Sequence, residues 1–408
     1  MQSEEFLVLF LIFIIMLSYF KSFSRSLFAI TAAMISVQVS TVTSAIAGSL
    51  DLRVAIEENV GSVRVGSSVN ALVKNGAGQV LGEIQGMNGF TAVSGGSGVS
   101  LDKWSASRIV IEPKDTNGVV WIGDRWYRGR TTLVPTGGGL TAVNNVDLEA
   151  YLASVLGGEM NGGWHQEALK AQAVAARSYA LYRRNRDGNG NFDLCDTARC
   201  QVYRGVQDES AGTQAAVAAT AGQVLTYRGQ IIEALFHSSS GGPDGGATEN
   251  VEDVWGSQVP YLKAVKDYDA SSPVSSWTKT IGRSELGNLV GMGPVDAVNP
   301  VGRPTAGGSY RELEFVSGGN RKRVKTGFLR DELNLRSAKI SIVPQLGQTK
   351  SGGKNQAFSS FEIRGNGFGH GLGLSQYGAK ALAEQNQGYA TIVKHYFTGT
   401  ELRKIDPQ

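Results

Sequence analysis

This sequence has few cysteines and a small net charge, and each of these features excludes a class of protein. Only two cysteines occur among 408 residues, so the chain is not a miniprotein held together by disulfides. The 39 lysines and arginines against 36 aspartates and glutamates leave a net charge of +3, which is too small for a dedicated nucleic-acid binder. The 53 glycines follow no triplet period, which excludes collagen. Apolar residues, at 41%, are plentiful enough for a large packed core.

The first 47 residues have the pattern of an export segment. Phe6–Phe20 is an almost unbroken apolar run, followed by the basic residues Lys21 and Arg25 and by a second apolar run. The small residues of Ala45-Ile46-Ala47 then provide a cleavage site. Residues 1–47 are interpreted as a signal peptide, as a retained N-terminal anchor or as a buried core helix. Either of the first two places the rest of the protein outside the cytoplasmic membrane, with this segment as its only contact with the membrane.

The remaining sequence predicts an α+β protein. Residues 48–140 form a β-rich part, because short alternating runs such as Val119–Ile122 lie between turn residues. Residues 141–402 begin with a central helical pair, continue with mixed strands and helices and close with two C-terminal helices, and residues 403–408 are a tail. Later elements are predicted at Thr213–Ala221, at the hairpin strands Val224–Tyr227 and Ile231–Phe236, and at Gly327–Leu333, Ser360–Ile363, Leu374–Asn386 and Tyr389–Phe397.

The helical pair is the most regular part of the pattern. Leu148–Leu156 carries one apolar face, with Asp147 as a plausible N-cap and Gly157-Gly158 as its end. A second helix is predicted over residues 164–184, where alanines form a stripe that permits close packing. Three basic residues share another of its faces: Lys170, Arg177 and Arg184. That face is interpreted as a solvated surface or as one that attracts an anionic polymer.

Glu159 is the leading candidate for a catalytic residue. No lysine or arginine lies among its near neighbours, and four glycines surround it. If the carboxyl group is partly buried between the helices, its pKa should be raised, which suits a general acid near neutral pH. The gap left by the glycines could admit a polymer, and Trp164 could offer a face to a sugar ring. The alternative is an ordinary glutamate at a helix end, exposed to water.

A glycine-rich loop near the C-terminus is the second candidate. Glycine occupies every second position from 365 to 373, so a ligand or a strand could approach the backbone closely. His370 in this loop is interpreted as a substrate donor or as a structural histidine, and Gln376 could add a polar contact. The loop lacks the lysine of a phosphate-binding motif. A Ser/His/acid triad using Ser238–Ser240 is disfavoured, because the sequence contains no G-x-S-x-G motif.

The two cysteines, Cys195 and Cys200, are separated by four residues. In an exported protein this spacing favours a local disulfide. A zinc site that uses both thiolates and a distant histidine is the alternative, but no second C-x-x-C or nearby histidine supports it. No other cofactor is expected.

Several long motifs resemble the SpoIID/LytB family of bacterial cell-wall proteins. The string GEMNGGWHQEALKAQAVAARSYA over residues 158–180 looks like the core of that family. The other matching motifs follow in the family's order: DLCD at 193–196, CQVY at 200–203, FHSSSGG at 236–242, Trp255 with PYLK at 260–263, and GFGHGLGLSQYGA at 367–379. The resemblance covers about residues 50–402.

The resemblance implies that peptidoglycan is the substrate. Members similar to SpoIID are lytic transglycosylases that act on glycan strands without peptides, and members similar to LytB enhance a cell-wall amidase. The family's motif places Glu159 at the catalytic acid position, and Tyr261, Lys263 and His370 in motifs near the glycan groove. Some members hold zinc near the position of Cys195–Cys200, but the matching histidines are absent here.

Three functions therefore remain in competition. The first is a lytic transglycosylase that cleaves the bond between N-acetylmuramic acid and N-acetylglucosamine, with Glu159 as the single acid and base. The second is a non-catalytic module that binds glycan strands or stimulates an N-acetylmuramoyl-L-alanine amidase. The third is a structural envelope protein with a decayed site. In each case the protein is expected in the periplasm or cell wall, secreted or anchored by its N-terminus.

Overall fold

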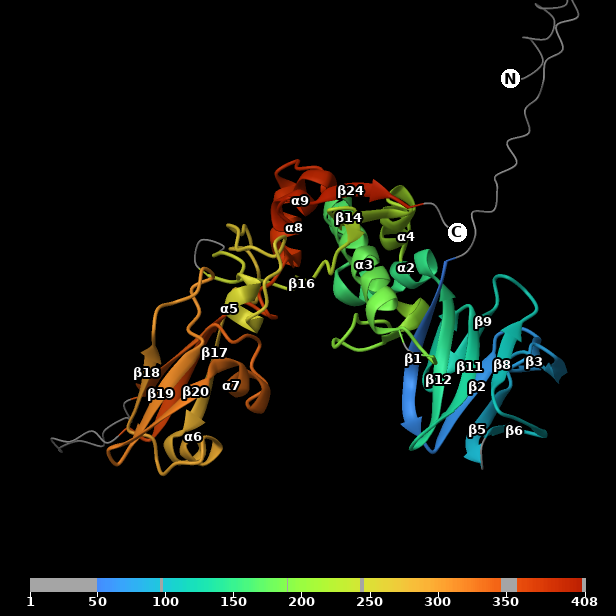
Figure 1. The fold of residues 1–408 in the computed structure, drawn as a ribbon, viewed down its shortest axis with the longest axis horizontal. Helices are drawn as coiled ribbons and strands as arrows, with labels where there is room; N and C mark the ends of the chain where they lie inside the picture. The colour runs from blue at the N-terminus through green and yellow to red at the C-terminus, as the bar shows by residue number, and fades with distance from the viewer. Residues whose placement is uncertain (1–49, 96–97, 189, 243–245, 346–357, 406–408) are drawn as a thin grey trace, which may run out of the picture. The chain divides into compact units, whose positions relative to one another are not determined.

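The computed structural model describes residues 50–95, 98–188, 190–242, 246–345 and 358–405 (Figure 1). The α+β class is confirmed, because these residues contain helices together with many strands in several sheets. The segment interpreted as a signal peptide or anchor lies outside the described residues. Within them, no helix combines the length and the apolar character needed to cross a membrane.

Two largely antiparallel sheets form the N-terminal part. The first has the order β13-β1-β12-β11-β8-β3-β4, with bounds Leu194–Cys195, Asp51–Val60, Gly139–Asp147, Arg130–Thr136, Ile109–Pro113, Ala71–Asn75 and Val80–Ile84. The second has the order β10-β9-β2-β5-β6-β7, with bounds Arg125–Arg128, Val119–Ile122, Ser62–Ser67, Gly89–Gly95, Gly98–Leu101 and Trp104–Ala106. Ile109 and Ile111 of the first sheet share one buried cluster with Val63 and Val65 of the second. The sheets therefore pack face to face.

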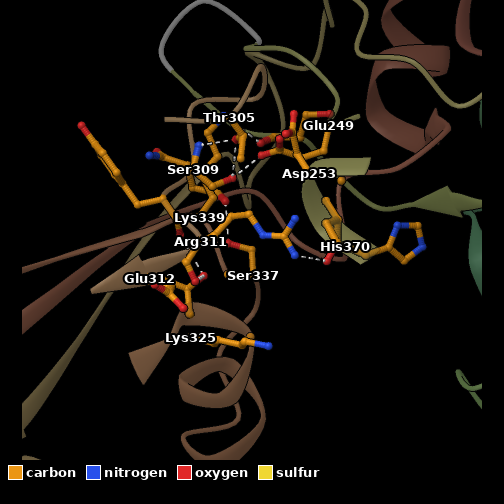
Figure 2. A pocket seen from close by; sticks show the side chains of 18 of the residues that line it. Glu249, Asp253, Thr305, Ser309, Arg311, Glu312, Lys325, Ser337, Lys339 and His370 are labelled. Carbon is orange, nitrogen blue, oxygen red and sulfur yellow. Dashed lines mark hydrogen bonds between the residues drawn. The ribbon is translucent and has the colours of Figure 1, made fainter. Parts of the chain in front are cut away.

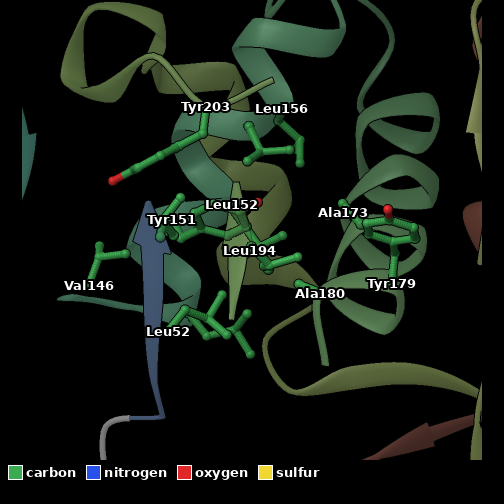
Figure 3. Packing of buried hydrophobic residues seen from close by; sticks show 14 of the residues in the cluster. Leu52, Val146, Tyr151, Leu152, Leu156, Ala173, Tyr179, Ala180, Leu194 and Tyr203 are labelled. Atoms are coloured by element: carbon green, nitrogen blue, oxygen red, sulfur yellow. The ribbon is translucent and has the colours of Figure 1, made fainter. Parts of the chain in front are cut away.

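The helix α2 (Leu148–Glu159) follows β12 directly. Its N-cap is the predicted Asp147, whose Oδ1 accepts hydrogen bonds from two backbone N–H groups of the first turn, at 2.9 and 3.1 Å. Leu152 and Leu156 lie in the buried cluster together with Leu194 of β13 (Figure 3). This packing fixes the helix whose last residue is Glu159.

The prediction that Gly157-Gly158 ends this helix is wrong, because α2 continues through both glycines. Their role is to admit a neighbouring segment. A Cβ atom at Gly157 would lie 1.8 Å from the carbonyl oxygen of Asp208, and one at Gly158 would lie 2.8 Å from that of Val202. The helix ends at Glu159 because Met160 takes an extended conformation.

The helix α3 (Gln166–Asp187) begins two residues later than predicted, since His165 is its N-cap. The His165 Nδ1 accepts a hydrogen bond from the backbone N–H of Glu167 at 3.2 Å. The predicted alanine stripe is fully buried, and α3 packs against α2, α4, α8 and α9. Small side chains allow these helices to approach α3 closely.

The interpretation of a solvated basic face on α3 is wrong for Arg177. This side chain is fully buried, and its guanidinium donates to the Glu149 carboxylate at 2.9 and 2.5 Å and to the carbonyl oxygen of Gln223 at 3.1 Å. Lys170 instead pairs with Glu167 at 2.7 Å at a partly exposed position. Heptad spacing alone did not distinguish the two, because neighbouring helices cover α3 on most of its faces.

The rest of the central part consists of short elements. They are the 3₁₀ helix η1 (Gly205–Asp208), α4 (Ala211–Ala219), β14 (Gln223–Tyr227), β15 (Gln230–Ile231), β16 (Phe236–His237), α5 (Val251–Trp255), β23 (Leu374–Ser375), α8 (Gln376–Glu384), α9 (Tyr389–Tyr396) and β24 (Glu401–Lys404). β14 pairs with both β15 and β24. Because β24 extends to Lys404, regular structure continues past residue 402 into the predicted tail. β16 pairs in parallel with β23 and thereby joins two motifs that are far apart in the sequence.

Residues 276–366 have a hydrophobic cluster of their own, centred on Phe315 and Phe361. Two three-stranded sheets carry it, with the orders β17-β22-β21 and β18-β19-β20. Their bounds are Ser276–Gly282, Ser360–Asn366, Ile340–Gln345, Ala297–Val301, Glu312–Ser317 and Asn320–Lys325. Two short helices accompany them, α6 (Arg283–Leu289) and α7 (Thr326–Glu332).

Candidate active site

The Glu159 carboxyl group lies half-buried where three distant segments meet. Its Oε1 accepts a hydrogen bond from the backbone N–H of Val202 at 2.9 Å, and its Oε2 accepts one from the Gln376 side chain at 3.2 Å. Val202 is 43 residues away in the sequence and Gln376 is 217 residues away. The fold thus holds both carboxyl oxygens in defined positions.

Burial raises the pKa of the Glu159 carboxyl above its ordinary value, because removal from water disfavours the charged form. Three contacts act in the opposite direction: the hydrogen bond from Val202, the hydrogen bond from Gln376 and the charge of Arg204. Burial outweighs them, and the Arg204 guanidinium is already bound to Asp208 at 2.8 Å. A carboxyl group in this state holds a proton at higher pH than a solvated glutamate does.

A disulfide loop positions the Val202 N–H group. Cys195 and Cys200 are joined as a disulfide, and Cys195 lies on β13 beside Ala55 of β1. Downstream of the disulfide, the Tyr203 N–H donates to the carbonyl oxygen of Asp196 at 2.9 Å. The loop is therefore tied to the sheet on one side and to Glu159 on the other.

Zinc does not fit the cysteine pair as it is arranged here. Both sulfur atoms take part in the disulfide, whereas a zinc ligand must be a thiolate. In the ranges that the structure describes, no group of three or more histidine, cysteine, aspartate or glutamate side chains is arranged to hold a metal ion.

Reduction of this disulfide should destabilise the protein by about 2 kcal/mol, the loop-entropy value for so short a loop. The Cys195→Ser/Cys200→Ser variant should show the same loss, since it removes the same constraint on the unfolded chain. Urea unfolding of the wild type with and without dithiothreitol measures the effect, and the variant serves as the control that should not respond to the reductant. Equal midpoints for oxidised and reduced wild type would contradict the expectation.

Trp164 and Gln376 both lie at the Glu159 end of the helical pair. The Trp164 ring packs edge to face on Tyr377, the residue after Gln376, with 4.9 Å between ring centroids. The Lys380 ammonium lies 5.8 Å from the Trp164 ring centroid. Trp164 as a whole remains partly exposed. The first turn of α8 thus joins these two predicted residues to Glu159.

Tyr261 and Lys263 take part in other contacts. The Tyr261 hydroxyl accepts a hydrogen bond from the backbone N–H of Glu233 at 3.3 Å, and its ring lies 5.8 Å from that of Tyr227. Burial raises the pKa of Tyr261 to about 12. Lys263 forms an ion pair with Glu252 on α5. These contacts do not connect either residue to Glu159.

His370 lies in a second cluster of rings. Its centroid is 5.7 Å from that of His237 and 5.7 Å from that of Trp255, and its Nδ1 accepts a hydrogen bond from the backbone N–H of Leu372 at 3.0 Å. Burial lowers the pKa of His370 to about 3, so the imidazole is neutral at physiological pH. His237 lies on β16 opposite Ser375, the residue before Gln376, so the β16–β23 pair connects this cluster with the segment that carries Gln376.

The serine run does not complete a Ser/His/acid triad. The His237 Nε2 lies 2.9 Å from the Ser240 hydroxyl, whereas its Nδ1 faces the carbonyl oxygen of Leu372 at 3.1 Å. The nearby carboxylate, Asp269, accepts hydrogen bonds from the Ser239 hydroxyl and from the Gly241 N–H, and not from His237. Among the residues that the structure describes, neither ring nitrogen of His237 is hydrogen-bonded to a carboxylate, as the histidine of such a triad would be.

Sequence reasoning missed the backbone N–H of Val202. A backbone donor leaves no trace in residue type, and only the family string CQVY over residues 200–203 marked the segment. The neighbouring Gln201 is also functional in the fold, because its buried side chain accepts a hydrogen bond from the Tyr151 hydroxyl and donates one to the carbonyl oxygen of Ala176. These bonds fix the segment that carries the donor.

The amino-acid sequence of this chain is similar to those of known proteins. The family described as SpoIID, stage II sporulation protein, matches residues 136–227. An uncharacterized protein of Brachyspira hyodysenteriae is 30% identical over 295 residues, which cover 72% of this chain and 76% of that protein. Stage II sporulation protein D of Bacillus subtilis is 34% identical over 285 residues, which cover 65% of this chain and 77% of that protein. The amidase enhancer of Bacillus subtilis is 32% identical over 298 residues, which cover 62% of this chain and 40% of that protein.

Proposed function

Because this chain belongs to the SpoIID/LytB family of bacterial cell-wall proteins, we propose that it is a lytic transglycosylase of peptidoglycan with Glu159 as its general acid and base. One observation carries the proposal. The Glu159 carboxyl group is half-buried, has a raised pKa and is held through both oxygens by groups from distant segments. A fixed carboxyl group of this kind is what acid catalysis at a glycosidic bond requires.

In the first step, the protonated Glu159 donates its proton to the oxygen between N-acetylmuramic acid and N-acetylglucosamine. The bond from that oxygen to C1 of the muramic acid breaks, and an oxocarbenium-like sugar remains. A backbone N–H group can only donate, and that of Val202 donates to Oε1. Oε2 is therefore the oxygen that carries the proton. The Gln376 amide donates to Oε2 of the carboxylate, so it moves aside when Oε2 is protonated and returns when the proton has been transferred.

In the second step, the Glu159 carboxylate takes the proton of the sugar's own 6-hydroxyl group. The 6-oxygen then bonds to C1 and closes a 1,6-anhydro ring, which restores the protonated Glu159. Ordinary glycosidases use two carboxyl groups, because water or a protein group is their nucleophile. Here the substrate supplies the nucleophile, so a single carboxyl group is sufficient. We assign Trp164 as a surface for a sugar ring, because this partly exposed residue lies beside the first turn of α8.

The direct test is mass spectrometry of glycan strands without peptides after incubation with the purified protein. The proposal expects products that end in 1,6-anhydro-N-acetylmuramic acid. Products with a free reducing end would indicate that water is the nucleophile, and intact strands would contradict the enzymatic function. A digest of the same strands with a hydrolytic muramidase supplies the mass standard for the alternative.

The rate of cleavage should fall as the pH rises through the pKa of Glu159, since only the protonated form can donate. The hydrogen bond from Gln376 stabilises the carboxylate and lowers this pKa. Gln376→Leu should therefore raise the pKa and move the alkaline limb of the pH–rate profile to higher pH, at a lower maximal rate. Gln385→Leu, at an exposed position just after the same helix, is the matched control and should leave the limb in place. An unchanged limb in Gln376→Leu would contradict the assigned contact.

One relative favours a second candidate function. It is named amidase enhancer, and a corresponding role here would be to bind glycan strands and stimulate a cell-wall amidase without cleaving the strands. In that case amidase stimulation would survive Glu159→Gln, and the purified protein would release no anhydro product. For either function we propose a location outside the cytoplasmic membrane, in the periplasm or cell wall, reached through the segment at residues 1–47.

A further inference from the structure

An ion pair in the segment that follows the disulfide lies close to the proposed catalytic acid. The cavity drawn in Figure 2 gathers many charged side chains beside residues 276–366, but Glu159 does not line it. The charge that acts on Glu159 belongs instead to Arg204, whose Nε donates to Asp208 Oδ2 at 2.8 Å. The proposed reaction has so far given neither residue of this pair a role.

Asp208 is the last residue of η1 and packs against the last turn of α2. A Cβ atom at Gly157 would lie 1.8 Å from the Asp208 carbonyl oxygen, and one at Gly158 would lie 3.1 Å from the Asp208 Oδ2. Glycine at both positions thus admits the backbone and the carboxylate of Asp208. The Asp208 side chain is only 12% exposed. Its carboxylate therefore occupies a defined place beside the residue that precedes Glu159.

The backbone on both sides of Arg204 is fixed by hydrogen bonds. The Tyr203 hydroxyl donates to Asn144 Oδ1 at 2.8 Å, and both of these side chains are buried. The Ser154 hydroxyl of α2 donates to the carbonyl oxygen of Gly205 at 2.8 Å. Arg204 lies between these two anchored residues, so its charge is held near the end of α2.

The charge of Arg204 favours the carboxylate form of Glu159 and lowers its pKa, against the effect of burial. The Arg204 side chain is 43% exposed, so water weakens this effect, and the opposite charge of Asp208 weakens it further. On its other sides Glu159 faces the uncharged amide of Gln376 from α8. Within α2, Tyr151 stays neutral, because burial raises its pKa well above the usual range.

We propose that Arg204 and Asp208 are positioning residues that together set how readily Glu159 gives up and recovers its proton. Arg204 stabilises the carboxylate that remains after Glu159 has protonated the glycosidic oxygen. Asp208 limits this stabilisation, so that Glu159 still holds its proton before the reaction. A general acid acts best when its pKa lies near the working pH, which the opposed charges achieve. The inference rests on the proposed function in that Glu159 must be the acid.

Nuclear magnetic resonance of the side-chain carboxyl carbon of Glu159 tests the proposal without turnover. The protein is labelled with ¹³C-glutamate, and the signal that disappears in Glu159→Gln identifies the residue. Arg204→Gln should raise the pKa of Glu159 by about half a pH unit, a shift reduced by the exposure of the guanidinium. Arg204→Lys retains the charge and should keep most of the wild-type value. Asp208→Asn should shift the pKa in the opposite direction, because it leaves Arg204 without its counter-charge.

A double-variant cycle shows whether Asp208 acts through Arg204. In the Arg204→Gln protein, the further change Asp208→Asn should leave the pKa of Glu159 where it is. Arg128→Gln is the matched control, because Arg128 pairs with Glu209 at 2.7 Å in the same segment and is 40% exposed. This control should not shift the pKa. An unchanged pKa in Arg204→Gln would overturn the proposal, as would an equal shift in the control.

The alkaline limb of the pH–rate profile should move in the same direction as the pKa in each variant. Circular dichroism confirms that the variants are folded, and the recovery in Arg204→Lys separates charge from structure. The outcome is separable from that of the proposed function. Opposite pKa shifts in a protein that releases no anhydro product would refute the transglycosylase and support the control of the Glu159 proton by the pair. Cleavage by a protein whose Glu159 has the same pKa in all variants would do the reverse.

Discussion

Replacing Glu159 with glutamine should lower the release of 1,6-anhydro products by about 10²–10⁴-fold, the range expected when a general acid is removed. Glutamine has nearly the same shape as glutamate but cannot donate a proton to the glycosidic oxygen or accept one from the 6-hydroxyl group. Both proposed steps are therefore lost together. Mass spectrometry of products over time measures the rate. A variant that releases anhydro sugars at the wild-type rate would exclude Glu159 as the acid.

The Glu159→Gln variant should remain folded. Its side chain can still accept from Val202 and can pair with the Gln376 amide. Because the folded pKa of Glu159 is raised, the wild-type carboxyl group favours the folded state at low pH and loses this contribution as the pH rises through that pKa. The stability of the variant relative to the wild type should thus increase over that pH range, as thermal unfolding would show.

Glu384→Gln is the matched control for the loss of a carboxylate. Glu384 lies at the exposed end of α8, the helix that begins with Gln376, and pairs with Lys380 at 2.6 Å. An exposed ion pair contributes at most about 1 kcal/mol, so this change should affect neither cleavage nor stability strongly. A similar loss of activity in both variants would indicate a general charge effect and would contradict a specific role for Glu159.

The sequence was sufficient to predict the fold class, the helical pair and the candidate acid. The N-cap at Asp147 and the period of apolar residues defined α2, because these signals are local. The end of the helix was predicted wrongly at Gly157-Gly158, since glycine can serve close packing as well as termination. Only the three-dimensional approach of residues 202–208 distinguishes the two roles.

The sequence predicted those residues of the site whose side chains have a recognisable chemistry. Glu159 and Gln376 were both named from the sequence, but their hydrogen bond across 217 residues could not be derived from it. The Val202 donor is a backbone group, which no residue type marks in the sequence. Lys263 forms an ion pair with Glu252, a contact that the family motif did not reveal. Long-range packing thus determines these contacts, and the local sequence pattern does not.

The largest effect on stability is expected at the ion pair between Arg177 and Glu149. Arg177 on α3 is fully buried, whereas the Glu149 side chain on α2 keeps 32% exposure. Glu149→Ala would leave a buried guanidinium with carbonyl oxygens as its only acceptors, among them that of Gln223 on β14. We expect a loss of about 3 kcal/mol in the free energy of unfolding, the lower end of the range for breaking a buried pair, because water can reach the vacated position. Urea denaturation measures it.

The double variant Glu149→Leu/Arg177→Met separates the charge from the packing. It removes both charges and retains apolar volume between α2, α3 and β14, so it should recover most of the stability that Glu149→Ala loses. Recovery would mean that the cost comes from an unpaired buried cation. If the double variant were as unstable as Glu149→Ala, the pair would contribute through its specific hydrogen bonds to the segment at β14, namely those of Arg177 with the Gln223 carbonyl oxygen and of Glu149 with the Gly222 N–H.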